Sequence, residues 1–448
     1  MLPVELLRHI FSYISDPRCF DTVYYQPSKL QRYQFEYSSG RKELATKKAL
    51  LLVSKAFYAI AQELVWSWIS IFSKERLLRV DTILNGQENT AYCIRRIEVQ
   101  LSFERLGYDN SAAVVQALAR ILAKCANLEV YISDISVASV DCQRTAAIII
   151  NKLKALPNLQ RLDFAGHEGP SIGDYIELIP HLGKLQQLLT GRIAEMDIED
   201  RQLPKLVRCD GPEYHSSEDE ESRVAMSWPS LEFLQISSRP IYSCWRLFIR
   251  LSLPSLTHLS IQIVDFYSIR CKAFFEIYGH QLTHLYTNDI RTAESPFGYA
   301  RILLLCPNLQ HLTFSPRLKD DRHHEPWRHR NLQTLALRDT LPSSIPAQVL
   351  LADNISRSVA DFNELIVQSR INGDLPCLET IRIEDVDNGA SELERRYGAS
   401  WDEICQRGGV RLEDGRGRRI PWELPDLPNQ ALDKIKKPGF VKRFLNSL

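Results

Sequence analysis

A short leucine phrase recurs through most of the chain and constrains its fold more than any other feature. The phrase is a leucine, two variable residues, a second leucine, one variable residue and an apolar residue, as in LPNLQRLDF, LPSLTHLSI and CPNLQHLTF. Its first leucine stands at Leu128, Leu159, Leu185, Leu206, Leu231, Leu256, Leu282, Leu309, Leu332 and Leu378. The eight intervals from Leu128 to Leu332 span 204 residues, a mean of 25.5, and the last interval of 46 fits two units.

This spacing is typical of leucine-rich repeats, whose units run roughly 20–29 residues. Side chains alternate between the two faces of a strand, so the second leucine and the apolar residue two places on point the same way. Residues 268–279 and 298–306, between phrases, carry apolar residues at helical spacing and predict helices. A strand and a helix cannot bury their apolar faces alone, but stacked repeats can. The sequence therefore predicts an α/β fold: a curved solenoid over residues 76–390, with a parallel concave sheet and convex helices.

The alternation also predicts which side chains the strands present to the concave side, namely the residues just before and just after the second leucine. These candidate target-binding residues are Phe233, Gln235, His258, Ser260, His284, Tyr286, His311, Thr313 and Thr334, and Arg338 follows on the same face; Arg161 and Asp163 hold the same positions in an earlier repeat. Three consecutive repeats carry histidine, which serves in metal sites, in catalysis and on ordinary surfaces. The pattern places no row of acids beside the histidines, which favours an ordinary surface or a protein-binding patch. A loop with His323, His324, His329, Asp320 and Asp321 is a weaker alternative for a metal.

The ten cysteines occur singly, with no CxxC pair, which argues against a zinc ribbon or a redox pair. Cys209, Cys306 and Cys377 stand where other repeats carry an apolar or a turn residue, so we expect small buried side chains. The chain has no Walker loop, no GxGxxG after a strand, no HExxH and no GxSxG. We therefore expect no catalytic residue, no cofactor and no metal.

The charge is balanced, with 55 lysines and arginines against 55 acidic residues. A balanced charge gives no basic footprint for nucleic acid or a membrane surface, and no apolar run approaches the roughly 20 residues that span a bilayer. We expect an intracellular protein of the cytoplasm, the nucleus or both. Residues 211–222 and 319–330 read as solvated loops, the first with serines that phosphorylation would make more acidic. The basic stretch 434–443 is a solvated tail or a weak nuclear-import signal.

The N-terminal stretch MLPVELLRHIFSYISD is strongly apolar. Pro3 suits the first turn of a helix, and Leu6, Ile10 and Ile14 form one apolar stripe. A second apolar stretch, ALLLVSKAFYAIAQELVWSWI, follows later. Short helices this apolar need a partner, which is either another molecule or the first edge of the solenoid.

Together these stretches resemble an F-box. The matching residues are Leu2, Pro3, Glu5, Leu6, Leu7, Ile10, Phe11, Ile14, Leu52, Val53, Ser54, Lys55, Phe57, Leu64 and Trp66, with phenylalanine at Phe57 where the family often has tryptophan. An insertion of about residues 17–45 separates the two parts. The resemblance gives an F-box-like helical domain over residues 1–75. Residues 391–448 form a cap and basic tail, where ASWDEICQRGGVRLED is similar to the closing helix–strand unit of such proteins in fungi.

The resemblance implies a substrate-recognition subunit of a Skp–cullin–F-box ubiquitin ligase. The implied adaptor-binding residues are Leu2, Pro3, Glu5, Leu6, Leu7, Ile10, Phe11, Ile14, Val53, Phe57 and Trp66. They would bind a Skp-type adaptor and, through it, a cullin, while the repeats bind a target protein. The subunit would be non-catalytic. The alternatives are a leucine-rich-repeat scaffold or inhibitor without a role in ubiquitination, and a cysteine-dependent enzyme.

Overall fold

The chain falls into two compact units, Met1–Arg317 and Leu318–Leu448. The structure is a computed structural model, and it describes residues 53–102, 111–136, 142–164, 169–190, 193–194, 226–236, 245, 247–265, 269–291, 298–314, 327–337, 366, 368–383 and 407–414. The proposed first helix of the F-box and its insertion lie outside these residues, and the domain borders at 75 and 390 stay predictions.

The described strands of the first unit form one parallel sheet in the order β1-β2-β3-β4-β6-β8-β9-β10-β11. Their bounds are Trp68–Ile71 (β1), Arg96–Ser102 (β2), Val130–Ser136 (β3), Arg161–Phe164 (β4), Gln187–Thr190 (β6), Phe233–Ile236 (β8), His258–Asp265 (β9), His284–Arg291 (β10) and His311–Phe314 (β11). A separate parallel pair joins β5 (Gly169–Ser171) to β7 (Ile193–Ala194). Each strand of the main sheet lies beside the strand of the preceding repeat, which is the arrangement of a leucine-rich-repeat α/β solenoid.

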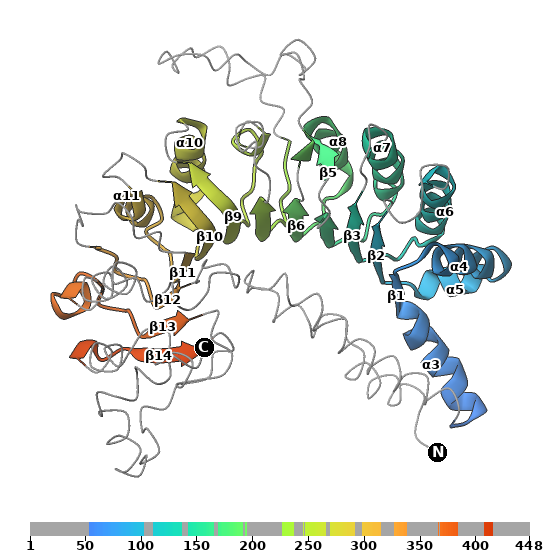
Figure 1. Cartoon of the computed structure of the whole chain (residues 1–448), viewed down its shortest axis with the longest axis horizontal. Helices are drawn as coiled ribbons and strands as arrows, with labels where there is room; N and C mark the ends of the chain where they lie inside the picture. Colours follow the sequence, from blue (N-terminus) through green and yellow to red (C-terminus); the bar gives the residue numbers. More distant parts are fainter. Residues whose placement is uncertain are drawn as a thin grey trace, which may run out of the picture. The chain divides into compact units, whose positions relative to one another are not determined.

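Helices lie along one face of this sheet (Figure 1). They are α4 (Lys74–Gly86), α6 (Ser111–Lys124), α7 (Cys142–Leu153), α8 (Ile172–Leu178), α10 (Ile269–Tyr278) and α11 (Gly298–Leu305), with α3 (Lys55–Ser67) and α5 (Glu88–Cys93) at the N-terminal end and the short turns η4 (Ile179–His181) and η5 (Gly279–Gln281). Helices α10 and α11 confirm the two helices predicted over residues 268–279 and 298–306. We call the other side of the sheet in this unit, which carries no helix among the described residues, the open face.

The core of the unit is a row of apolar side chains under the sheet. In the described strands, the second leucine of the phrase, or the apolar residue at the same register position, is buried in line with its neighbours, as predicted. The row consists of Ile69, Ile97, Tyr131, Leu162, Leu188, Leu234, Leu259, Leu285 and Leu312. Burying one such side chain contributes about 1.5–3 kcal/mol, so the row stabilises the stack at every repeat.

A turn precedes most strands and links adjacent repeats. In the LPNL sequence, the Leu159 amide donates to the Leu156 carbonyl at 3.2 Å, and Pro157 suits the second position of such a turn. The next two amides, of Gln160 and Arg161, both donate to the Glu129 carbonyl of the preceding repeat, at 2.8 and 3.0 Å. The same pair of hydrogen bonds recurs at β6, β8, β9, β10 and β11. The turn therefore delivers each new strand to the sheet in a fixed register.

Two of the predicted repeats add no strand between their described neighbours in the sheet. Strand β6 pairs directly with β8, Gln187 opposite Phe233, so the phrase at Leu206 places no strand between them. In the second unit, Thr334 lies opposite Thr380, so the 46-residue interval after Leu332 does not hold a second strand in the sheet there. Both predictions were wrong, because neither a leucine phrase nor the length of an interval by itself specifies a strand of the sheet. The long polar and acidic stretch after Leu206 has no apolar helical pattern to cover a strand.

The cysteine predictions hold at one position and fail at another. Cys306 is buried at the first position of its turn, where burial raises the pKa of its thiol to about 12. Cys125 holds the same position in its repeat, also with a pKa raised to about 12, mainly by burial. Cys377 is exposed instead, because it is the third residue of the turn. Asn308 and Ser255 hold this position elsewhere and donate to main-chain carbonyls of the preceding repeat, both at 2.6 Å. Cys209 lies outside the described residues.

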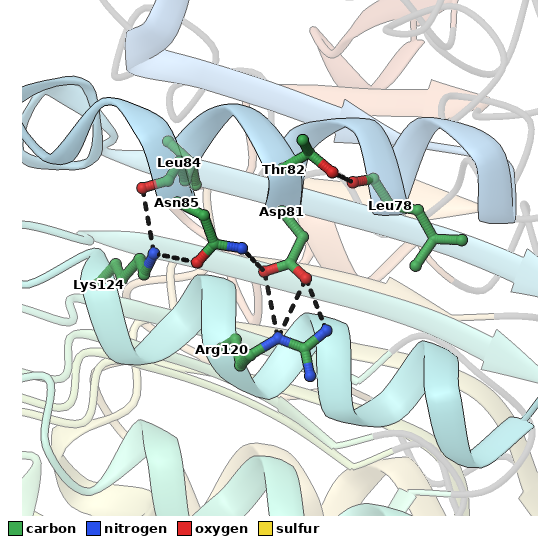
Figure 2. Close-up of polar contacts among 7 residues, drawn as sticks. All are labelled: Leu78, Asp81, Thr82, Leu84, Asn85, Arg120 and Lys124. Carbon is green, nitrogen blue, oxygen red and sulfur yellow. Dashed lines mark hydrogen bonds and ion pairs between the residues drawn. The ribbon is translucent and has the colours of Figure 1, made fainter.

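Polar contacts join α4 to α6 on the helical side of the sheet (Figure 2). The buried carboxylate of Asp81 accepts from the Arg120 guanidinium at 2.6 Å, and this hydrogen bond is the main cause of a raised pKa at Arg120. Lys124 donates to the Leu84 carbonyl at 3.1 Å and to Asn85 at 2.5 Å. Its cation therefore lies at the C-terminal end of α4, where a helix favours positive charge.

We expect Arg120→Met to lower the free energy of unfolding by about 1 kcal/mol, because the buried Asp81 carboxylate loses its charged donors. Half of the Arg120 side chain is exposed, so water screens the ion pair and limits the loss. Urea denaturation measures the change. Arg79→Met, at an exposed position of α4, is the control and should stay within about 0.5 kcal/mol of the wild type. An equal loss in both variants would contradict the assignment to the Asp81 contact.

The second unit has three parallel strands among its described residues: β12 (Thr334–Leu337), β13 (Thr380–Ile383) and β14 (Arg411–Asp414), in that order. Leu335, Ile381 and Leu412 lie in register and are buried, which repeats the pattern of the first unit. Strand β14 falls within the segment that resembles a closing unit. Across both units, none of the helices that the structure describes is long and apolar enough to cross a membrane.

Candidate functional site

Two rows of side chains stand at the open-face positions of the strands. The row before the second leucine is Arg161, Gln187, Phe233, His258, His284 and His311. The row after it is Asp163, Leu189, Gln235, Ser260, Tyr286 and Thr313. The direct pairing of their strands brings the candidate residues of β8 to β11 together in one continuous surface, as the alternation predicts.

The three histidines of the first row form a stack that we call the histidine ladder: His258, His284 and His311. The centroids of the His258 and His284 rings are 4.0 Å apart and the planes differ by 17°. The His284 and His311 rings are 4.1 Å apart at 19°. Phe233 continues the row, with its ring 6.5 Å from that of His258. The ladder and Phe233 together thus form a strip of four rings that crosses four strands.

The imidazoles of His258 and His284 stay neutral near pH 7. Burial lowers the pKa of His258 to about 4, with a further contribution from His311. Burial likewise lowers the pKa of His284 to about 3, and both neighbouring histidines lower it further. The Thr257 hydroxyl lies 2.8 Å from Nδ1 of His258, and the Thr283 hydroxyl lies 2.9 Å from Nδ1 of His284. These contacts hold the two rings in parallel orientations.

Histidine is also a common metal ligand. Among the residues that the structure describes, no three histidine, cysteine or acidic side chains are grouped to bind a metal ion. In the alternative loop, His329 is buried and its Nδ1 accepts the Asn331 amide at 3.2 Å. The other members of that loop set, His323, His324, Asp320 and Asp321, lie outside the described residues.

The candidate target-binding residues are less accessible than a solvent-facing row should be. Phe233, Ser260, Tyr286 and Thr313 are buried, at 4%, 7%, 7% and 7% exposure. Gln235 and the three histidines are half-buried. Neighbouring strands lie about 4.8 Å apart, so side chains of adjacent repeats cover one another. Thr334 is half-buried on β12 of the second unit, and Arg338 lies outside the described residues.

The N-terminal part of the open face carries paired charges that sequence reasoning missed. Arg161 and Asp163 are both 2% exposed, and their charged atoms lie 3.1 Å apart. Arg96 is 1% exposed, contacts Glu98 at 2.5 Å and lies over the Trp68 ring at 4.8 Å. In both strands the opposite charges stand two residues apart, which places them on one face. Opposite charges two residues apart in a predicted strand were therefore the sequence signal that could have revealed these two ion pairs.

The described part of the adaptor-binding set lies on and just before α3. Ser54 caps this helix by accepting the Phe57 amide at 3.2 Å. Val53 is 61% exposed, whereas Phe57 and Trp66 are half-buried. Tyr58, which the sequence analysis did not single out, is 51% exposed. The other adaptor-binding residues, Leu2, Pro3, Glu5, Leu6, Leu7, Ile10, Phe11 and Ile14, lie outside the described residues.

Helix α3 connects this apolar surface directly to the solenoid. It packs against α5 and leads without a loop into β1, the first strand of the sheet. Figure 1 shows α3 leaving the row of helices at the β1 end of the unit. Exposed apolar side chains therefore lie at the start of the solenoid, on and just before a helix that packs against it.

No protein-family model matches the chain, and no curated protein matches it. Among solved structures, the chain is similar to an internalin (inlF) from Listeria monocytogenes str. 4b F2365, at 12% sequence identity and a TM-score of 0.25. The match covers 73% of this chain and 75% of the internalin. The assignment of the fold rests on the strand order and on the register of the buried leucines.

Proposed function

We propose that the chain is the substrate-recognition subunit of a Skp–cullin–F-box ubiquitin ligase. Its F-box would dock a Skp-type adaptor, and the open face of its repeats would bind the target protein. The resemblance of the N-terminal residues to an F-box supports the first half of the proposal. The leucine-rich-repeat fold, which builds extended binding surfaces, supports the second.

One observation carries the proposal furthest: the position of α3. The helix begins at Lys55, inside the stretch that resembles the second part of an F-box; Val53, just before it, and Tyr58, within it, are exposed. Exposed apolar side chains of this size favour contact with another protein. Because α3 runs into β1, an adaptor bound there would be coupled to the target-binding repeats.

Such a subunit would act by bringing the target close to the conjugating enzyme and would not itself catalyse a reaction. It would raise the effective concentration of a target lysine near ubiquitin carried by a conjugating enzyme elsewhere in the complex. The thiols of Cys125 and Cys306 fit this non-catalytic role, since burial raises the pKa of both to about 12 and disfavours the nucleophilic thiolate. Cys93 also has a raised pKa, mainly from burial.

The proposal predicts capture of a purified Skp-type adaptor, alone or bound to a cullin, by the full chain. The double variant Leu6→Asp/Phe11→Asp should lose this capture, by about a hundredfold or more, because it places charges in a contact that must exclude water. The measurement is pull-down followed by titration of the adaptor against the immobilised chain. Circular dichroism would verify that each variant is folded.

The matched control is Leu304→Asp, which adds the same charge at an apolar side chain on α11 that is 78% exposed. It should bind the adaptor as the wild type does. If the wild-type chain never captures the adaptor, the proposal fails, and the chain is better described as a leucine-rich-repeat scaffold or inhibitor.

A further inference from the structure

The rings of the histidine ladder lie so close together that two protonated neighbours would repel each other strongly. His284 lies between His258 and His311, with ring centroids 4.0 and 4.1 Å away. Neutral aromatic rings gain from stacking at such separations, whereas two imidazolium charges so close repel strongly in a half-buried site. The stacked arrangement therefore suits uncharged rings only.

Among the described residues, the four side chains that adjoin the ladder on the open face are uncharged. Phe233 on β8, Ser260 on β9, Tyr286 on β10 and Thr313 on β11 occupy the adjoining open-face positions and are buried. The hydroxyls of Thr257 and Thr283 contact the ring nitrogens. The charged residues of these segments stand at other register positions: Glu232 before β8, Asp265 at the end of β9, and Asp289 and Arg291 on β10.

We propose that the histidine ladder is a proton-sensitive element of the open face, which packs closely near neutral pH and separates when its rings take up protons. Each step adds one proton from solvent to the unprotonated ring nitrogen and one positive charge to the stack. A second charge drives neighbouring rings apart. The ladder crosses β9 to β11, so its separation alters this part of the open face. This inference goes beyond the proposed function and does not depend on it.

The direction of the pH effect follows from the lowered pKa values of His258 and His284, about 4 and about 3, against an ordinary value of 6.5. Below pH 6.5 these histidines bind protons in the unfolded chain and stay neutral in the folded one. Their contribution to stability is therefore complete above pH 6.5 and is lost as the pH falls toward the folded values.

The test compares the full wild-type chain with His258→Phe/His284→Phe/His311→Phe in urea unfolding at pH 7.5 and pH 5.0. Phenylalanine keeps a stacked ring but cannot take up a proton. Between the two pH values, the unfolding constant of the wild type should rise at least about tenfold more than that of the variant. His280→Phe, at an exposed histidine in η5, is the control and should follow the wild type.

A second measurement follows protonation in the wild type, so it stands even if the triple variant does not fold. Nuclear magnetic resonance of the imidazole Cε1–H groups, with the ladder signals assigned from single phenylalanine variants, reports protonation of each ring. The signals of His258 and His284 should show no titration between pH 7.5 and 5.5. Titration near pH 6.5 without a change in ring contacts, or equal acid sensitivity of the wild type and the triple variant, would overturn the proposal.

Discussion

Replacing Asp163 with alanine should lower the free energy of unfolding by about 3–5 kcal/mol, the cost of leaving one partner of a buried ion pair without the other. Arg161 and Asp163 are both 2% exposed, and their charged atoms lie 3.1 Å apart on the same strand. Without the carboxylate, the guanidinium keeps its charge in a site that water does not reach. Chemical denaturation of the two proteins measures the loss.

Two further variants show whether the loss comes from the unpaired charge. In Arg161→Met/Asp163→Leu both charges are absent, and stability should return close to that of the wild type. Glu379→Ala removes one partner of an exposed strand-to-strand pair, in which Arg411 and Glu379 are 55% and 67% exposed, and should cost under about 1 kcal/mol. A loss of under 1 kcal/mol for Asp163→Ala itself would show that the pair is not buried as the structure has it.

The second large effect is expected at Gly279, where alanine should lower the free energy of unfolding by about 2–3 kcal/mol through overpacking. A Cβ atom at this position would lie 2.3 Å from the Leu305 carbonyl oxygen and 3.3 Å from Sγ of Cys306. The nearest atom belongs to the main chain of the next repeat, so no side-chain rotation relieves the clash. Glycine is needed here for close approach rather than for an unusual backbone angle.

Gly183→Ala is the matched control, because its Cβ would meet nothing within 4 Å. It should change stability by no more than about 0.5 kcal/mol in either direction. Thermal and urea unfolding of both variants measure the difference. Equal stability of Gly279→Ala and Gly183→Ala would contradict the close packing of η5 against the end of α11.

The repeat fold was predictable because two independent periods agree along the chain. Alternation within each strand placed Leu259, Leu285 and Leu312 in the core, and the spacing of about 25 residues placed their strands side by side. The same reasoning predicted the alignment of the three histidines. It failed at Leu206, where the leucine phrase is present but the structure pairs β6 with β8 directly.

The character of the open face was less predictable, because exposure depends on side chains that lie far away in sequence. Alternation assigns Tyr286 to that face correctly but does not reveal that it is buried. Cys377 was misassigned for a related reason, since its exposure depends on its place within a turn and not on its apolar character. The adaptor-binding residues were predicted mainly from the resemblance to an F-box. The structure describes three of them, Val53, Phe57 and Trp66.

The paired amides that begin most strands have a consequence for how such a chain can change length. Gln160 and Arg161 share the Glu129 carbonyl, and Gln186 and Gln187 share that of Gln160. Each junction is thus formed by the same main-chain hydrogen bonds as the next, and these bonds do not depend on the side chains on either side. Duplication or loss of one complete unit leaves matching junctions behind, whereas an insertion of a few residues between a turn and its strand does not. Evolution can accordingly lengthen or shorten this architecture in whole modules while varying the surface that each module displays.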